Sequence, residues 1–127
     1  MRRIIRELRE VSASGECYHR VGAVVVKGKA ILCSSVNKRS RITRYGKTIF
    51  TTHAEINAMK KLNPKELAGA TLYVGRFGGI DGEESRLAAP CEQCQNHIAK
   101  TGIKEVFYTV NPDNSNEKVC WESYKPD

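Results

Sequence analysis

The chain has 127 residues, 40% of them hydrophobic, and a formal net charge of +7. A length of about one domain, with neither a run of roughly 20 apolar residues nor an apolar core behind the basic start, predicts a single cytoplasmic domain over residues 1–127 without membrane contact. The charge favours a phosphate-bearing partner, which could be a nucleotide or a nucleic-acid polymer.

The N-terminal part of the chain is predicted to form a helix followed by a β-hairpin. Apolar residues recur at helical spacing between residues 4 and 11, which predicts an amphipathic helix that ends near Ser14-Gly15. Two apolar runs, residues 21–26 and residues 30–36, flank Lys27-Gly28-Lys29. This pattern is typical of two antiparallel strands joined by a tight turn.

The middle of the chain is predicted to form a basic loop and a short helix. Residues 37–47 are polar and strongly basic, which favours a loop. The residues that follow lead into a short helix that ends before Pro64. We expect His53 in the first turn of this helix.

The second half of the chain is predicted to alternate between strand and helix. The expected elements are a strand over residues 70–77, a loop over residues 78–84, a helix from Pro90 to about Lys100, a strand over residues 103–110, and a turn with a short helix after Asp113. Because Pro is favoured at the first helical position, Cys91 and Cys94 are expected in the first turn of their helix. Strands interleaved with helices predict an α/β fold with helices packed on a mixed sheet.

His53, Cys91 and Cys94 form a candidate metal site. Five cysteines without a secretory context favour reduced thiols or metal ligation over disulfides. The Cys-x-x-Cys spacing lets two thiolates in one helical turn converge on one ion, and a His with two Cys suits Zn²⁺. Since both ligand sets are predicted at helix starts, the positive ends of the helix dipoles would favour thiolates. Three protein ligands leave the fourth zinc position to water.

Glu55 is the candidate proton carrier. A carboxylate two residues beyond a ligand His can lie beside the metal without binding it, and can then exchange protons with an activated water. One alternative is that Thr52-x-x-Glu55 is a capping box, in which Glu55 only satisfies a backbone amide. Another is that the Cys pair belongs to a closed structural zinc site completed by His97 or Cys120. Only an open zinc site has a use for Glu55.

The candidate zinc ligands and Glu55 lie in two short motifs that resemble those of a known superfamily. The sequence His53-Ala54-Glu55, followed by Pro90-Cys91-Glu92-Gln93-Cys94, resembles the zinc signature of the cytidine deaminase superfamily. The resemblance covers roughly residues 18–110. Within the superfamily, the sequence is most similar to the deoxycytidylate (dCMP) deaminase branch. The run Asn37-Lys38-Arg39 departs from that branch and looks closer to the transfer-RNA adenosine deaminases.

The resemblance implies a cytidine deaminase-like three-layer α/β fold, with a mixed central sheet of about five strands flanked by helices. It also implies a zinc-dependent deaminase domain without an organic cofactor, which hydrolyses the cytosine base of a (deoxy)nucleotide such as dCMP to the uracil product and ammonia. We expect a homo-oligomer. The alternatives are a nucleic-acid-editing deaminase, acting on cytosine in single-stranded DNA or RNA or on adenosine in tRNA, and a non-catalytic zinc-stabilised binding domain.

Several residues are expected to contact the substrate. The resemblance implies that Asn37 contacts the sugar and that the amide of Cys91 borders the reacting carbon. We also assign Ala54, Lys38 and Arg39 to the substrate site. The basic run that begins at Lys38 either binds phosphate or is a solvated charged loop.

Acidic residues favour a mononucleotide over a polymer as the substrate. Asp81, Glu83 and Glu84 lie close in sequence to Cys91. We expect them to repel a phosphate backbone at the mouth of the site, or to pair with the basic loop.

Overall fold

The computed structural model describes residues 2–13, 20–42, 48–78, 82–112 and 117–126. Its centre is a six-stranded mixed sheet with the strand order β2-β1-β5-β7-β8, in which β6 also pairs with β5. All pairs are antiparallel except β5 and β7, which run parallel. The strands are β1 (Val21–Lys27), β2 (Ala30–Val36), β5 (Thr71–Gly78), β6 (Glu84–Arg86), β7 (Glu105–Val110) and β8 (Cys120–Tyr124).

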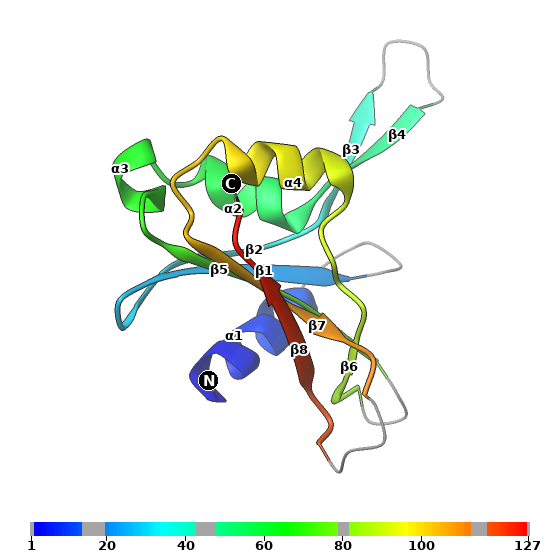
Figure 1. Ribbon diagram of the computed structural model, residues 1–127. Coiled ribbons are helices and arrows are strands. Elements are labelled where there is room, and N and C mark those ends of the chain that lie inside the picture. Colours follow the sequence, from blue (N-terminus) through cyan, green and yellow to red (C-terminus); the bar gives the residue numbers. More distant parts are fainter. Residues whose placement is uncertain (1, 14–19, 43–47, 79–81, 113–116, 127) are drawn as a thin grey trace.

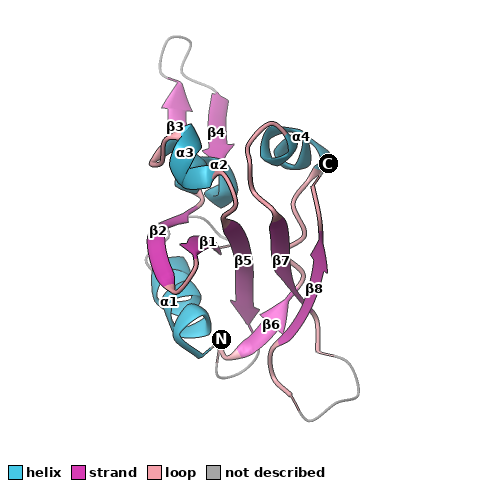
Figure 2. Ribbon diagram, turned by 60° about the vertical axis from the view of Figure 1, so that its left-hand side comes forward, coloured by secondary structure: helices cyan, strands magenta, loops and turns pink. Residues whose placement is uncertain are grey.

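Helices cover both faces of the sheet, which gives three layers (Figure 1). Helix α1 (Arg2–Ala13) lies on one face, while α2 (Ala54–Lys60) and α4 (Glu92–Ala99) lie on the other, as Figure 2 also shows. The short helix α3 (Pro64–Leu67) follows α2. The predicted α/β class with a mixed sheet flanked by helices is confirmed.

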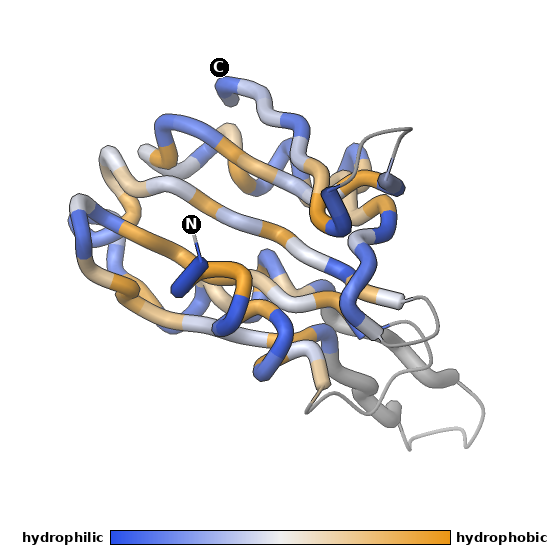
Figure 3. The backbone as a smooth tube through the Cα atoms, turned by 90° about the horizontal axis from the view of Figure 1, so that it is seen from below, coloured by the Kyte–Doolittle hydropathy of each residue, from blue (hydrophilic) through white to orange (hydrophobic). Residues whose placement is uncertain are grey.

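The core explains why the first predicted hairpin is so apolar. In β1, Ala23 and Val25 pack into the cluster under α2 and α4, whereas Val24 and Val26 pack with Leu8 under α1. A strand that is buried on both faces reads as a continuous apolar run rather than an alternating one. Figure 3 shows the same pattern, with apolar segments running along the central strands.

A strand replaces part of the predicted basic loop. The backbone of β3 (Lys38–Ile42) pairs antiparallel with β4 (Thr48–Thr52) in a separate two-stranded sheet. The loop prediction was wrong here because β3 is rich in charged residues and has no alternation of apolar and polar residues, although its backbone pairs with β4. Residues 43–47 lie outside the described part of the chain.

The predicted C-terminal helix is also wrong, because residues 120–124 form β8 at the edge of the sheet. Trp121 on this strand meets the ring of Tyr73 edge-on at 5.9 Å, and the Tyr73 ring stacks on Phe107 at 5.1 Å. Such cross-strand aromatic contacts stabilise a sheet, and the local sequence does not reveal them. Short β6 and α3 were likewise not predicted.

No helix in the described ranges is both long and apolar enough to cross a bilayer.

Gly102 is the point of closest approach between the loop before β7 and the loop after α3. Its carbonyl accepts a hydrogen bond from the amide of Gly69 at 2.7 Å. A β-carbon at position 102 would lie 2.6 Å from the α-carbon of Ala68, a distance that forces backbone movement.

We therefore expect Gly102→Ala to lower the free energy of unfolding by about 1–3 kcal/mol through overpacking. Urea denaturation, monitored by circular dichroism, measures this change in the free energy of unfolding. Lys104→Ala, at an exposed position of the same loop, serves as the control and should change stability by less than about 0.5 kcal/mol. Equal effects of both substitutions would contradict the steric explanation.

Candidate zinc centre and substrate cavity

The candidate ligands lie at the N-termini of α2 and α4. His53 is the N-cap of α2, and Cys91 is the N-cap of α4. Neither side chain bonds to the amides of its own helix, so both can turn towards a shared point. Cys91 has an extended backbone (φ −70°, ψ 167°), and α4 begins at Glu92. The prediction that His53 and Cys91 lie within the first helical turn is therefore wrong by one residue for each.

The ligand atoms of His53, Cys91 and Cys94 converge. The Nδ1 atom of His53 lies 3.1 Å from the sulfur of Cys94 and 3.7 Å from the sulfur of Cys91. All three ligand atoms lie within 4.8 Å of one another. Tetrahedral zinc, with bonds of about 2.3 Å to sulfur and 2.0–2.1 Å to nitrogen, requires a sulfur–nitrogen separation of about 3.6 Å. The donor set and its spacing therefore fit zinc.

The residues that could have closed this site as a four-ligand structural centre lie elsewhere. His97 is exposed in the last turn of α4, and Cys120 is on β8. Within the described ranges neither belongs to a group of three side chains that could hold a metal. Among the described residues the candidate site therefore offers three protein ligands, which would leave a fourth zinc position to water.

The raised pKa of the Cys94 thiol indicates that a thiolate in this site needs a cation beside it. Burial, followed by the nearby carboxylate of Glu55, raises the pKa of the Cys94 thiol far above its ordinary value. A thiolate at this position is therefore costly without a nearby cation. A divalent metal supplies the missing positive charge and displaces the thiol proton.

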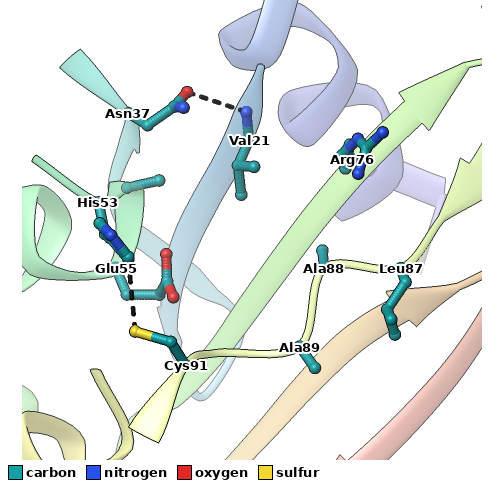
Figure 4. Close-up of a pocket in the computed structure, with 10 residues that line it drawn as sticks. Val21, Asn37, His53, Glu55, Arg76, Leu87, Ala88, Ala89 and Cys91 are labelled. Atoms are coloured by element: carbon teal, nitrogen blue, oxygen red, sulfur yellow. Dashed lines mark hydrogen bonds between the residues drawn. The ribbon is translucent and has the colours of Figure 1, made fainter. Parts of the chain in front are cut away.

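Glu55 lies beside the ligands on α2 and points into the cavity (Figure 4). Its side chain is only 4% exposed, and this burial raises the pKa of its carboxyl group. The capping-box alternative is wrong, because the N-cap of α2 is His53 rather than Thr52. A buried carboxyl group with a raised pKa is suited to exchange protons near neutral pH.

A cavity of about 290 Å³ opens beside the three ligands. It is lined by Val21, Asn37, His53, Ala54, Glu55, Arg76, Leu87, Ala88, Ala89 and Cys91. Of the residues assigned to the substrate, the structure brings Asn37 and Ala54 to this cavity. The Lys38 and Arg39 backbone begins β3, and their side chains lie outside the described part of the structure.

Asn37 joins the two strands that form one wall of the cavity. The side-chain oxygen of Asn37 accepts a hydrogen bond from the backbone amide of Val21 at 3.0 Å. The backbone amide of Asn37 donates to the carbonyl of Val21 at 3.1 Å. The side chain is 8% exposed. Asn37 therefore fixes the start of β1 against the end of β2, at the edge of the cavity.

The opposite wall comes from residues 84–89, for which the sequence predicts neither a helix nor a strand. The amide of Ser85 donates to the carbonyl of Lys118 at 2.8 Å, and the amide of Ala88 donates to the carbonyl of Thr109 at 2.9 Å. The amide of Leu87 donates to the side chain of Asn111 at 3.1 Å. These bonds hold residues 84–89 against β7 and the residues before β8. Because all of them are long-range, no local sequence pattern could have placed this wall.

Two acidic residues of the loop have basic partners among the described residues, whereas the side chains of the basic run lie outside the described part of the chain. Glu84 forms an ion pair with Arg86 at 3.1 Å, and Glu83 forms one with Lys118 at 3.2 Å. Asp81 lies outside the described residues.

Comparison with known proteins agrees with this geometry. The family model of the cytidine and deoxycytidylate deaminase zinc-binding region matches residues 1–110. The deoxycytidylate deaminase of Mycobacterium phage D29 is 31% identical over 110 residues, which cover 70% of this chain and 77% of the phage protein. The mouse deoxycytidylate deaminase is 29% identical over 70 residues, 55% of this chain, and the chain spans only 33% of the mouse protein.

Solved structures show the same fold. The crystal structure of dCMP deaminase from the cyanophage S-TIM5 in complex with dCMP and dUMP superposes with a TM-score of 0.61, at 25% sequence identity, and the match covers 84% of this chain and 78% of that one. The predicted cytidine deaminase-like three-layer fold is thereby confirmed. With the match of the family model over most of its length, the chain belongs to the cytidine and deoxycytidylate deaminase zinc-binding family.

Proposed function

We propose that this protein is a zinc-dependent deaminase that hydrolyses the cytosine base of a (deoxy)nucleotide such as dCMP to the uracil product and ammonia. The observation that carries the proposal is the buried carboxylate of Glu55, which faces the cavity beside a three-ligand metal site and is not itself one of the ligands. The D29 and mouse relatives are deoxycytidylate deaminases, and the cyanophage enzyme binds dCMP and dUMP.

In this proposal His53, Cys91 and Cys94 hold the zinc ion. When bound, zinc lowers the pKa of a water from about 15.7 to roughly 7, which provides a nucleophile at neutral pH. Glu55 would accept a proton from the attacking water as the water oxygen adds to C4 of the base, and would pass this proton to the ring nitrogen. Glu55 would then take the remaining proton from the new hydroxyl group at C4 and deliver it to the amine, as the bond between C4 and the exocyclic nitrogen breaks, ammonia leaves and C4 becomes a carbonyl.

The cavity walls would hold the base in place for this reaction. Ala54 and Cys91 belong to the helix starts that carry the ligands, and both line the cavity. Asn37 is fixed by its two hydrogen bonds to Val21 and would present the amide group of its side chain to the sugar. A volume of about 290 Å³ lies just below the roughly 300–1,000 Å³ typical of small-ligand pockets, and so favours a single nucleotide over a larger ligand.

The zinc assignment predicts the chemistry of the cysteines. We expect about one zinc per chain, with Cys91 and Cys94 protected from alkylation until a chelator removes the metal. Cys120 should react equally before and after chelation. His53→Ala should lose the metal, whereas His97→Ala, on the exposed side of α4, should retain it. A disulfide between Cys91 and Cys94 in fresh, metal-replete protein, detected by mass analysis without reductant, would disprove the model.

The proton-carrier assignment predicts the phenotype of Glu55→Ala. We expect this variant to keep its zinc and its fold while ammonia release from dCMP falls by roughly 10²–10⁴-fold, because it loses a proton carrier and no ligand. Glu92→Ala removes an exposed carboxylate from the first turn of α4 and serves as the control. Near wild-type turnover by Glu55→Ala would show that the carboxylate is not catalytic.

The size of the substrate can be read from its salt dependence. We expect turnover of a cytosine mononucleotide that depends weakly on salt. A single strand that engages several basic side chains would instead show a slope in log affinity against log salt of about −0.7 for each neutralised phosphate. Assays of dCMP, CMP, their nucleosides and a cytosine-containing strand at several salt concentrations separate the two classes. Turnover of the strand alone, with a steep slope, would favour the nucleic-acid-editing alternative.

A further inference from the structure

Arg76 occupies an unusual place on β5. Side chains two residues apart share one face of a strand, so Arg76 continues the row of Leu72 and Val74. Those two side chains are fully buried in the core beneath α2 and α4. Arg76 therefore points to the same side of the sheet as the candidate zinc centre. It is half-buried, and it lines the cavity.

The guanidinium of Arg76 makes no hydrogen bond or ion pair with the part of the chain that the structure describes. Its cross-strand neighbour provides the contrast. Arg86 lies opposite Arg76 in the register of β5 and β6, and it is paired with Glu84 at 3.1 Å. Arg86 also donates to the carbonyl of Ser85 at 2.9 Å. A half-buried charge without a protein partner is costly unless a ligand or water supplies one.

The charges that line the cavity are arranged asymmetrically. Among its described lining residues, Glu55 carries the carboxylate and Arg76 the guanidinium. Figure 4 shows Arg76 across the cavity from His53 and Cys91, with Glu55 on their side. An anionic group that enters is therefore attracted by Arg76 to the end of the cavity away from Glu55.

We propose that Arg76 binds the phosphate monoester of a cytosine mononucleotide, so that this residue makes the protein select nucleotides over nucleosides. The proposal rests on the proposed function, because it places the base at the zinc end and the phosphate at the other. A guanidinium is suited to this role, since its planar fork can donate two parallel hydrogen bonds to phosphate oxygens. No other basic side chain among the described lining residues competes for the phosphate.

The test compares substrates with and without the phosphate. For Arg76→Gln we expect kcat/KM for dCMP to fall about 10- to 100-fold, as for the loss of a hydrogen-bonded charge pair, while kcat/KM for deoxycytidine stays within about twofold. Arg76→Lys should recover only part of the loss, because it restores the charge without the fork. Arg6→Gln, which removes an exposed guanidinium from α1 on the other face of the sheet, should change neither value.

A binding experiment keeps the test independent of turnover. The zinc-loaded wild type and Arg76→Gln are titrated calorimetrically with dUMP and with deoxyuridine, and circular dichroism checks the fold of each variant. We expect the wild type to bind dUMP about 10- to 100-fold more tightly than deoxyuridine, and Arg76→Gln to lose this difference.

The outcomes distinguish two kinds of failure. Equal losses with dCMP and deoxycytidine, an unchanged ratio of dUMP to deoxyuridine affinity, or a wild type that binds both alike would overturn the role of Arg76. A wild type that deaminates neither dCMP nor deoxycytidine would overturn the proposed function. In that case the dUMP titration would still decide whether Arg76 binds the phosphate.

Discussion

The meeting of two helix N-termini is the constraint on which the rest of the site depends. The Nδ1 atom of His53, at the start of α2, lies 3.1 Å from the sulfur of Cys94 in the first turn of α4, although the two residues are 41 positions apart in the chain. Both helices pack on the same face of the sheet through a shared core. The positive ends of two helix dipoles thus face one point, which favours the thiolates that a metal needs.

The sheet and the segment that follows it supply the remaining chemistry. The paired hydrogen bonds between Asn37 and Val21 fix one wall, and residues 84–89, bonded to β7 and to the residues near β8, fix the other. Glu55 and Arg76 place opposite charges at the two ends of the space between these walls. A cavity polarised in this way orients a polar ligand before any contact with the metal is made.

The sequence predicted the elements whose signals are local. The apolar runs on either side of Gly28 predicted the first hairpin, and the short motifs around His53 and Cys91 predicted residues that the structure brings together. Strand β8 and the wall at residues 84–89 could not be predicted, because long-range pairing places them. The hairpin of β3 and β4 could not be predicted because β3, a run of mainly charged residues, lacks the apolar alternation of a strand. No local pattern separates a ligand contact of Arg76 from surface charge, since only the buried row of Leu72 and Val74 shows which way it points.

The parallel pairing of β5 and β7 affects how the ligands can meet. A parallel pair requires a crossover, and here the crossover contains α4 with Cys91 and Cys94. His53 lies 38 and 41 positions from its two cysteine partners, so they meet only through the tertiary fold. Contacts of such long sequence separation must overcome the loop-closure entropy. A metal held by all three side chains would therefore stabilise the native topology by linking segments that are distant in the chain.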